Sequence, residues 1–306
     1  MKPTQLSFVP SDRDRPVNVA SVPLRSPFRY PGGKTWLVPT LRAWLGSQTE
    51  RPTLLIEPFL GGGISSLTAV FEQLVERAIM VELDDAVADV WETVLSGDNE
   101  WLAERILGFD MQPDTLDQEL SRPGETVRER AFQTILRNRT YHGGIMAPGS
   151  GQLKYGESGR GVRSRWYPKT IATRIRDIWA VAERLAFIRG DGMKIMADYA
   201  AASNAVFFID PPYTAAGKRA GSRLYTHYEL DHEKLFGLAA GLTGDFLMTY
   251  DNANEIVKMA QAQGFDFKAI PMRNTHHAEM TELIIGRDLG WARTDRGFFE
   301  SGGDSV

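Results

Sequence analysis

The sequence predicts an α/β protein with a Rossmann-like sheet of seven strands, mostly parallel, with one antiparallel edge strand. A strand, a glycine-rich turn and a helical pattern follow one another over residues 53–77, as at the start of a nucleotide-binding βαβ unit. The uninterrupted apolar run at 205–209 is typical of a strand buried on both faces of a parallel sheet. Two further apolar runs, at 265–271 and 281–286, predict a hairpin that closes the sheet.

Four residues, Asp210-Pro211-Pro212-Tyr213, stand at the end of the 205–209 strand. The prolines have no backbone N–H, so the strand must stop there. A carboxylate, a carbonyl and an aromatic ring are thereby placed at the carboxyl end of a strand, where open α/β sheets bind ligands. An amino group on a flat ring fits this set, because Asp210 and the Pro211 carbonyl can accept its two hydrogens while Tyr213 stacks on the ring. The alternative interpretation of these four residues is a strand end followed by a turn, without a binding function.

The glycine-rich turn after the first strand reads PFLGGG over residues 58–63. It is not the dinucleotide fingerprint, since Ser66 stands where a further glycine is needed, and no GKS or GKT follows as in a phosphate-binding loop. The next strand, at 78–81, ends at Glu82, and an acid in this place can hold the two hydroxyls of a ribose. S-adenosylmethionine is consistent with the glycine turn and with Glu82, because it contains a ribose and has no phosphate group that would need a phosphate-binding loop.

A second glycine motif, FRYPGGK, occupies residues 28–34 and leads into a predicted helix. Paired glycines let the backbone approach a ligand closely, and a lysine at a helix start suits an anionic group. An ordinary loop-to-helix junction is the alternative. The other expected elements are strands at 185–189 and 245–250 and helices at 84–107, 131–139, 232–242 and 253–263.

Composition narrows the class of protein. The chain has no cysteine, which excludes disulfides and thiolate metal sites and fits a reducing cytosol. Its five histidines lack metal-ligand spacing, so no metal is expected. The N-terminus has no signal-peptide pattern and no stretch is long enough to span a membrane, so we expect a cytoplasmic protein.

The charge is unevenly distributed. Residues 121–185 contain 13 Lys/Arg and 5 Asp/Glu, which gives this segment a charge of +8. Because the net charge of the chain is −4, the remaining residues together carry −12. The second half of this segment is also rich in glycine and aromatic residues. A basic segment on an acidic body is the asymmetry expected of a nucleic-acid contact surface. A solvated surface insertion is the alternative.

Taken together and in this order, four stretches resemble the Dam-like class of S-adenosylmethionine-dependent DNA adenine-N6 methyltransferases. The stretches are residues 30–34, residues 57–63, Asn138-Arg139 with Gly143, and residues 210–213. The similarity covers about residues 27–287. Tyr30 stands where many members of the class have tryptophan, and Glu82 where many have aspartate. The basic segment matches only at its start, which leaves the recognised DNA sequence open.

The resemblance implies a role for each matched residue. It places Glu57 near the methionine end of the cofactor, Glu82 on the ribose and Asp191 on the adenine. The implied cofactor-binding residues are Tyr30, Gly33, Lys34, Glu57, Phe59, Gly61, Gly63, Glu82, Asp191 and Asp210. The implied catalytic residues are Asp210, Pro211, Pro212 and Tyr213. In the basic segment the candidate DNA contacts are Arg139, Tyr141, His142, Arg160, Arg163 and Arg165.

The resemblance also implies a domain organisation. A flexible N-terminal arm (1–26) is followed by a catalytic domain (27–97 and 185–290). The catalytic domain is interrupted by a mainly helical DNA-recognition domain (98–184) and followed by a C-terminal tail (291–306). Four prolines among polar residues favour the flexible arm independently.

The expected reaction is methylation of the N6 amine of an adenine flipped out of double-stranded DNA, as in restriction-modification or phage-defence systems. Whether a cognate restriction or defence protein accompanies this chain is left open. Three alternatives also remain open: cytosine N4 as the target, adenine in RNA as the target, or a DNA-binding protein that has lost activity. A small-molecule methyltransferase would leave the basic segment unexplained.

Overall fold

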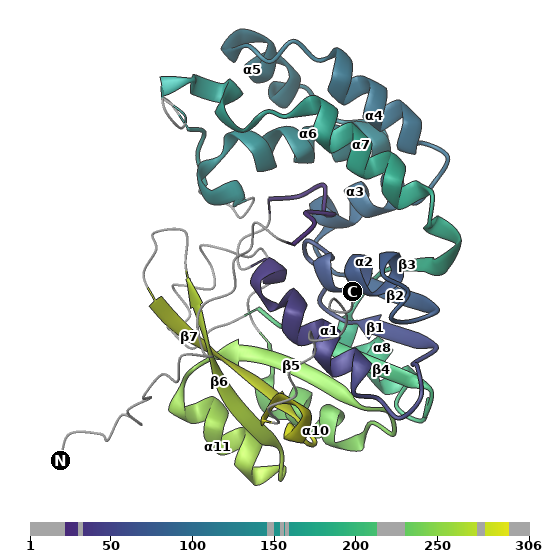
Figure 1. Cartoon of the computed structure of the whole chain (residues 1–306). Helices are drawn as coiled ribbons and strands as arrows, with labels where there is room; N and C mark the ends of the chain where they lie inside the picture. The colour runs from purple at the N-terminus through teal and green to yellow at the C-terminus, as the bar shows by residue number, and fades with distance from the viewer. Residues whose placement is uncertain are drawn as a thin grey trace, which may run out of the picture.

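The computed structural model describes residues 22–29, 33–145, 150–153, 156, 159–212, 230–273 and 279–293. Within these residues the centre is a seven-stranded sheet in the order β3-β2-β1-β4-β5-β7-β6 (Figure 1). The strands are β1 (Leu54–Glu57), β2 (Arg77–Glu82), β3 (Leu185–Arg189), β4 (Ala205–Ile209), β5 (Phe246–Asp251), β6 (Asp266–Arg273) and β7 (Glu279–Gly286). The order reverses between β1 and β4, which is the switch point where open α/β sheets bind ligands.

The predicted fold class is confirmed, with one difference in the position of the antiparallel strand. Strands β1 to β5 are parallel to one another, and β7 is antiparallel to both β5 and β6. The antiparallel strand is therefore one position in from the edge, and β6 is the edge strand. The reason is that the chain leaves β5 through α11 (Asn254–Ala262), forms β6 at the outside, and returns through the predicted hairpin into the gap beside β5.

Each face of the sheet is covered by its own layer of helices. Successive side chains of a strand point to opposite faces, so Phe207 belongs to one apolar cluster and Phe208 to the other. The cluster with Phe208 includes residues of α1 (Val38–Gly46), α2 (Ile64–Phe71) and α3 (Asp85–Val94). The cluster with Phe207 includes residues of α8 (Gly192–Asp198), α10 (His232–Gly241) and α11.

Four further helices form a group beyond α3, at the end of the sheet opposite the hairpin (Figure 1). They are α4 (Asn99–Gly108), α5 (Pro113–Ser121), α6 (Val127–Thr140) and α7 (Pro168–Trp179). Helix α6 packs on α3 and α7 packs on α4, and the buried residues between them, such as Phe132 and Ile175, continue the apolar cluster of that face. The helical group therefore shares a core with the sheet's helices.

Two sequence predictions about helices were wrong in detail. The expected helix at 84–107 is divided into α3 and α4, because Ser96 and Gly97 interrupt the helical pattern between them. Helices α5, α7, α8 and α12 (Gly290–Arg293) were not predicted. Helix α5 starts at Pro113 with a capping box between Gln112 and Thr115. This start signal was not recognised because the surrounding residues are polar and show no helical apolar pattern.

The described residues contain no helix with the length and apolarity that crossing a membrane requires. They also contain no group of three or more His, Asp or Glu side chains arranged to hold a metal ion.

Two glycine substitutions test the packing of the sheet away from the site. Gly244 lies against the carbonyl oxygen of Ala205 at the start of β4, so a Cβ there would overlap backbone. We expect Gly244→Ala to lower the free energy of unfolding by about 1–3 kcal/mol. Gly237→Ala is the control: its Cβ would meet nothing within 4 Å on an exposed turn of α10. It should raise the free energy of unfolding by up to about 1 kcal/mol, since alanine favours helix. Urea denaturation measures both, and effects of equal sign would contradict the close approach.

Candidate active site

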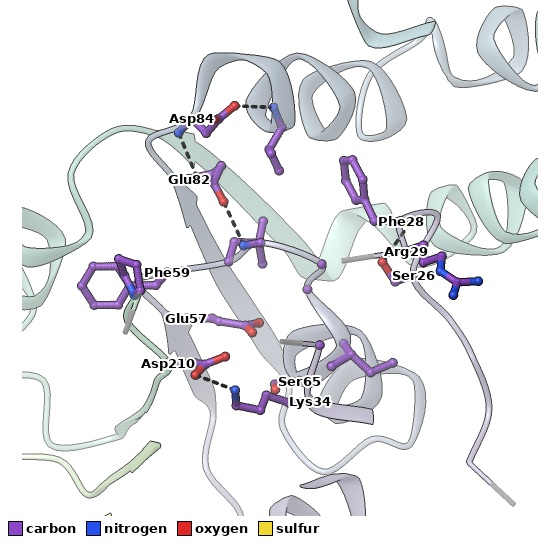
Figure 2. A pocket seen from close by; sticks show the side chains of 18 of the residues that line it. Ser26, Phe28, Arg29, Lys34, Glu57, Phe59, Ser65, Glu82, Asp84 and Asp210 are labelled. Atoms are coloured by element: carbon purple, nitrogen blue, oxygen red, sulfur yellow. Dashed lines mark hydrogen bonds and ion pairs between the residues drawn. The ribbon is translucent and has the colours of Figure 1, made fainter. Parts of the chain in front are cut away.

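A cavity of about 720 Å³ lies over the carboxyl edge of the sheet (Figure 2). One side is formed by the residues that follow β1, β2, β3 and β4, and the other by residues 24–29 together with side chains of α6 and α7. Its size is within the usual range for a small-molecule site. The motifs found separately in the sequence thus meet at one place.

The glycine turn is held in place by Glu82. The N–H of Gly61 donates to one carboxylate oxygen of Glu82 at 2.8 Å, and the N–H groups of Leu83 and Asp84 donate to the other at 2.9 Å each. Gly61 and Gly63 have positive φ angles of 47° and 64°. A Cβ on Gly63 would also meet the ring of Trp91 at 2.8 Å, so the turn needs glycine there for both reasons.

Two of the buried carboxyl groups at this edge are difficult to ionise. Burial raises the pKa of Glu57 to about 8, although the N–H of Ser66 donates to it at 2.9 Å. The negative charges of Asp210 and Glu82 raise the pKa of Glu57 further. Burial raises the pKa of Glu82 to about 7, against the opposing effect of its three backbone donors. The site is therefore poised to change its charge near neutral pH.

Asp210 is held by side chains from two other parts of the chain. The hydroxyl of Thr249 on β5 donates to its Oδ1 at 2.6 Å, and Lys34 Nζ lies 3.1 Å from the same atom. Lys34 is buried and also pairs with Glu282 of β7 at 3.4 Å. Figure 2 shows the pairing of Lys34 and Asp210 beside Glu57. The anionic group predicted for Lys34 is, in this structure, a carboxylate of the protein itself.

Thr249 and Glu282 were missed by sequence reasoning. Each is a polar residue within an otherwise apolar strand, in the runs FLMTYD and TELIIG, and that interruption was the available signal. Burial raises the pKa of Glu282 to about 7, with Lys34 acting in the opposite direction. Asp84 was also missed; it caps α3 by accepting from the N–H groups of Ala86 and Val87, and it lines the cavity.

Most of the other predicted cofactor residues lie at the cavity. Asp191 caps α8 by accepting from the N–H of Met193 at 2.8 Å, which places its carboxylate beside β2 and β3. Gly33, Phe59 and Pro212 line the cavity, whereas Pro211 is buried behind it. The predicted residues Tyr30 and Tyr213 lie outside the described part of the chain.

The six candidate DNA contacts differ in accessibility. His142, Arg160 and Arg163 are exposed, and Tyr141 is partly exposed. Arg165 is buried and donates to the carbonyl of Tyr141 at 3.2 Å. Arg139 is also buried and lines the cavity, where it donates to the carbonyl of Pro27. In this conformation the last two arginines are interior groups.

No family model matches this chain, and no curated protein matches it. Solved structures with a similar arrangement include a SAM-dependent methyltransferase from Agrobacterium tumefaciens (8% identity, TM-score 0.39, 83% of this chain and 61% of that chain). Others are the rRNA methyltransferase aviRa from Streptomyces viridochromogenes (14%, 0.39, 84% and 86%) and NSun6 from Pyrococcus horikoshii (10%, 0.36, 82% and 51%). Similarities this distant add nothing to the chemistry of the site.

The buried carboxyl of Glu57 predicts how stability depends on pH. Its pKa is higher in the folded than in the unfolded chain, so its contribution to stability is full below about pH 4.5 and is lost as the pH rises through about 8. Glu57→Gln cannot ionise. We expect the parent to lose about 1–3 kcal/mol of unfolding free energy relative to this variant between pH 5 and pH 8. Urea denaturation at four pH values measures the difference, and parallel profiles would show that Glu57 is not the titrating group.

Proposed function

We propose that this protein is an S-adenosylmethionine-dependent methyltransferase that acts on the N6 amine of adenine in duplex DNA. The observation that carries the proposal is that Asp210 and Pro212 share one cavity with the glycine turn and Glu82. A group that can hold an amine is thereby placed beside a group that can hold a ribose. The expected role in a restriction-modification or defence setting is part of the same proposal.

The lining of the cavity suits this cofactor. When bound, S-adenosylmethionine would supply a methyl group activated by a positively charged sulfonium. Glu82 would accept from the ribose hydroxyls with the lone pairs that its backbone donors leave, and Asp191 would lie at the adenine end. The carboxylates of Asp84 and Asp210 line the same side of the cavity and form an acidic wall, which favours a cationic ligand.

Asp210 would activate the target amine. The lone pair of an exocyclic amine is delocalised into the ring, which makes the nitrogen a poor nucleophile. Asp210 and the Pro211 carbonyl, accepting both hydrogens, would draw the nitrogen toward tetrahedral geometry and free the lone pair for the new N–C bond. Thr249 and Lys34 fix Oδ1 of Asp210, so the carboxylate is already oriented before the amine arrives.

The helical group would provide the nucleic-acid contact. It contains most of the basic segment, and in our proposal residues 98–184 are the recognition domain of the enzyme. A base within a duplex must leave the stack to reach the cavity, which costs a few kcal/mol. An aromatic side chain stacked on the flipped base, the role proposed for Tyr213, would return about 1–3 kcal/mol.

Cytosine N4 and adenine in RNA offer an amine of similar geometry, so the site itself does not separate them from adenine in DNA. The decisive experiment is to incubate the protein with methyl-labelled S-adenosylmethionine and with duplex DNA or RNA, and to digest the products to nucleosides. N6-methyladenine from DNA supports the proposal. Label in cytosine or in RNA would select an alternative, and no label with either polymer would favour a DNA-binding protein without activity.

Two substitutions separate the catalytic group from the cofactor group. We expect Asp210→Ala to reduce methyl transfer by more than about a hundredfold while S-adenosylmethionine still binds, because this carboxylate acts on the amine. Glu82→Ala should instead weaken cofactor binding by about 1.5–3 kcal/mol, since the ribose hydroxyls lose a charged acceptor. Calorimetry measures binding and label incorporation measures transfer. Transfer by Asp210→Ala within tenfold of the parent rate would remove Asp210 from catalysis.

The basic surface is tested by its salt dependence. Arg160 and Arg163 are at least partly exposed, whereas Arg165 is interior, so the appropriate variant is Arg160→Ala/Arg163→Ala with Arg165 retained. If both contact phosphate, duplex binding should weaken for all sequences, and the slope of log affinity against log salt should fall by about two units. Fluorescence anisotropy at several salt concentrations measures the slope. An unchanged slope would place the DNA contact elsewhere in the helical group.

A further inference from the structure

A short N-terminal segment, residues 22–29, closes one side of the cavity and is held there by α6 and α7. Arg174 Nη1 donates to the carbonyl of Ser26 at 3.0 Å, and Arg139 donates to the carbonyl of Pro27. The side chain of Asn138 accepts from the N–H of Arg29 at 2.8 Å and donates to its carbonyl at 3.0 Å. Both Arg139 and Arg174 also line the cavity.

Arg139 is a buried cation, and it forms no ion pair with the residues that the structure describes. The residue is only 6% exposed. Its Nε atom is buried and has no hydrogen-bond partner in the described part of the chain. Burial lowers the pKa of Arg139 to about 10, and the positive charges of Arg174 and Arg29 lower it further. Burial also lowers the pKa of Arg174. A buried charge in such surroundings is costly unless an anion accompanies it.

The segment that the two arginines hold packs close to the glycine turn. The indole N–H of Trp91 donates to the carbonyl of Gly61 at 3.0 Å, and the ring of Phe28 packs on Trp91 with centroids 5.9 Å apart. Phe28 directly follows Pro27, which accepts from Arg139. Figure 2 shows Phe28 and Arg29 across the cavity from Phe59 and on the other side from Asp210. The cavity thus has an acidic wall along the strand ends and a basic one opposite.

We propose that Arg139 and Arg174 form a carboxylate subsite inside the cavity, which binds the α-carboxylate of S-adenosylmethionine. The inference rests on the proposed function and adds to it the group that recognises the amino-acid end of the cofactor. With the ribose on Glu82, the amino-acid part extends over the glycine turn toward the basic wall. Guanidinium groups bind carboxylates in paired hydrogen bonds, and the residues Arg139 and Arg174 both line the cavity.

A nucleic-acid phosphate is the other anion that these arginines could bind, and burial argues against it. The phosphates of a duplex lie along a wide backbone, so they can contact only side chains that reach the protein surface, such as Arg160. Arg139 is only 6% exposed and lines a cavity of about 720 Å³, which suits a small ligand and not a duplex backbone. Arg139, expected from the sequence to touch DNA, is therefore assigned to the small ligand.

The first measurement needs no substitution. Calorimetry of the parent protein with S-adenosylmethionine and with decarboxylated S-adenosylmethionine compares two ligands that differ in the carboxylate alone. We expect the decarboxylated compound to bind at least about tenfold more weakly, as for the loss of a hydrogen-bonded charge. Equal affinities would overturn the subsite while leaving the proposed cofactor intact. A parent protein that binds neither compound would overturn the proposed function itself.

The second measurement assigns the effect to the arginine. Arg174→Gln should weaken binding of S-adenosylmethionine by about tenfold or more and leave binding of the decarboxylated compound within about twofold of the parent. Arg176→Gln is the matched control on the same helix: Arg176 pairs with Glu100 and Glu104 at the surface and should affect neither ligand. Circular dichroism melting verifies that each variant is folded. Equal weakening of both ligands by Arg174→Gln would overturn the assignment.

A third measurement, of nucleic-acid binding, distinguishes the cofactor carboxylate from a nucleic-acid phosphate. Duplex binding by Arg174→Gln is measured by fluorescence anisotropy over a range of salt concentrations. An unchanged salt slope supports the carboxylate subsite. A lower slope together with unchanged affinity for S-adenosylmethionine would assign the arginines to a phosphate and overturn the proposal.

Discussion

The site depends first on the carboxylate of Glu82. By accepting three backbone N–H groups, this side chain joins the glycine turn after β1 to the end of β2 and the start of α3. The same group is buried, which raises its pKa to about 7. Its ionised form is thus maintained by backbone donors that exist only when all three segments are in place. The geometry of the cavity and the charge of one wall are consequences of the same interaction.

The second constraint is the concentration of acidic groups where parallel strands end. Asp210 follows β4, and Glu57 and Glu282 come from β1 and β7. The sheet brings Asp210 close enough that its negative charge raises the pKa of both Glu57 and Glu282. Lys34 is the cation that reduces this repulsion, because it lies between Asp210 and Glu282. A buried lysine is costly by itself and is tolerated here because two carboxyl groups accompany it. The same pairing fixes the orientation of the Asp210 carboxylate in the site.

Local sequence signals were sufficient for the sheet and less so for the short helices. The runs at 54–56 and 205–209 are apolar on both faces, which is typical of buried strands, and the hairpin of β6 and β7 was equally clear. Helix α5 was concealed by its polarity: only Leu116 and Glu119 of its nine residues are buried, too few to give a helical pattern. Gly97 divided a helix that the apolar spacing alone had joined.

What the sequence by itself determined was the set of chemical groups and the strand ends that carry them: Asp210 after β4, Glu82 after β2, and the glycine turn between β1 and α2. Chain order and strand length are local properties, and parallel strands bring their carboxyl ends to one edge. Only the tertiary structure decided that Lys34 meets Asp210, that β7 enters beside β5, and that Arg139 is buried. Each of these depends on contacts between segments distant in sequence, and no local pattern encodes such contacts.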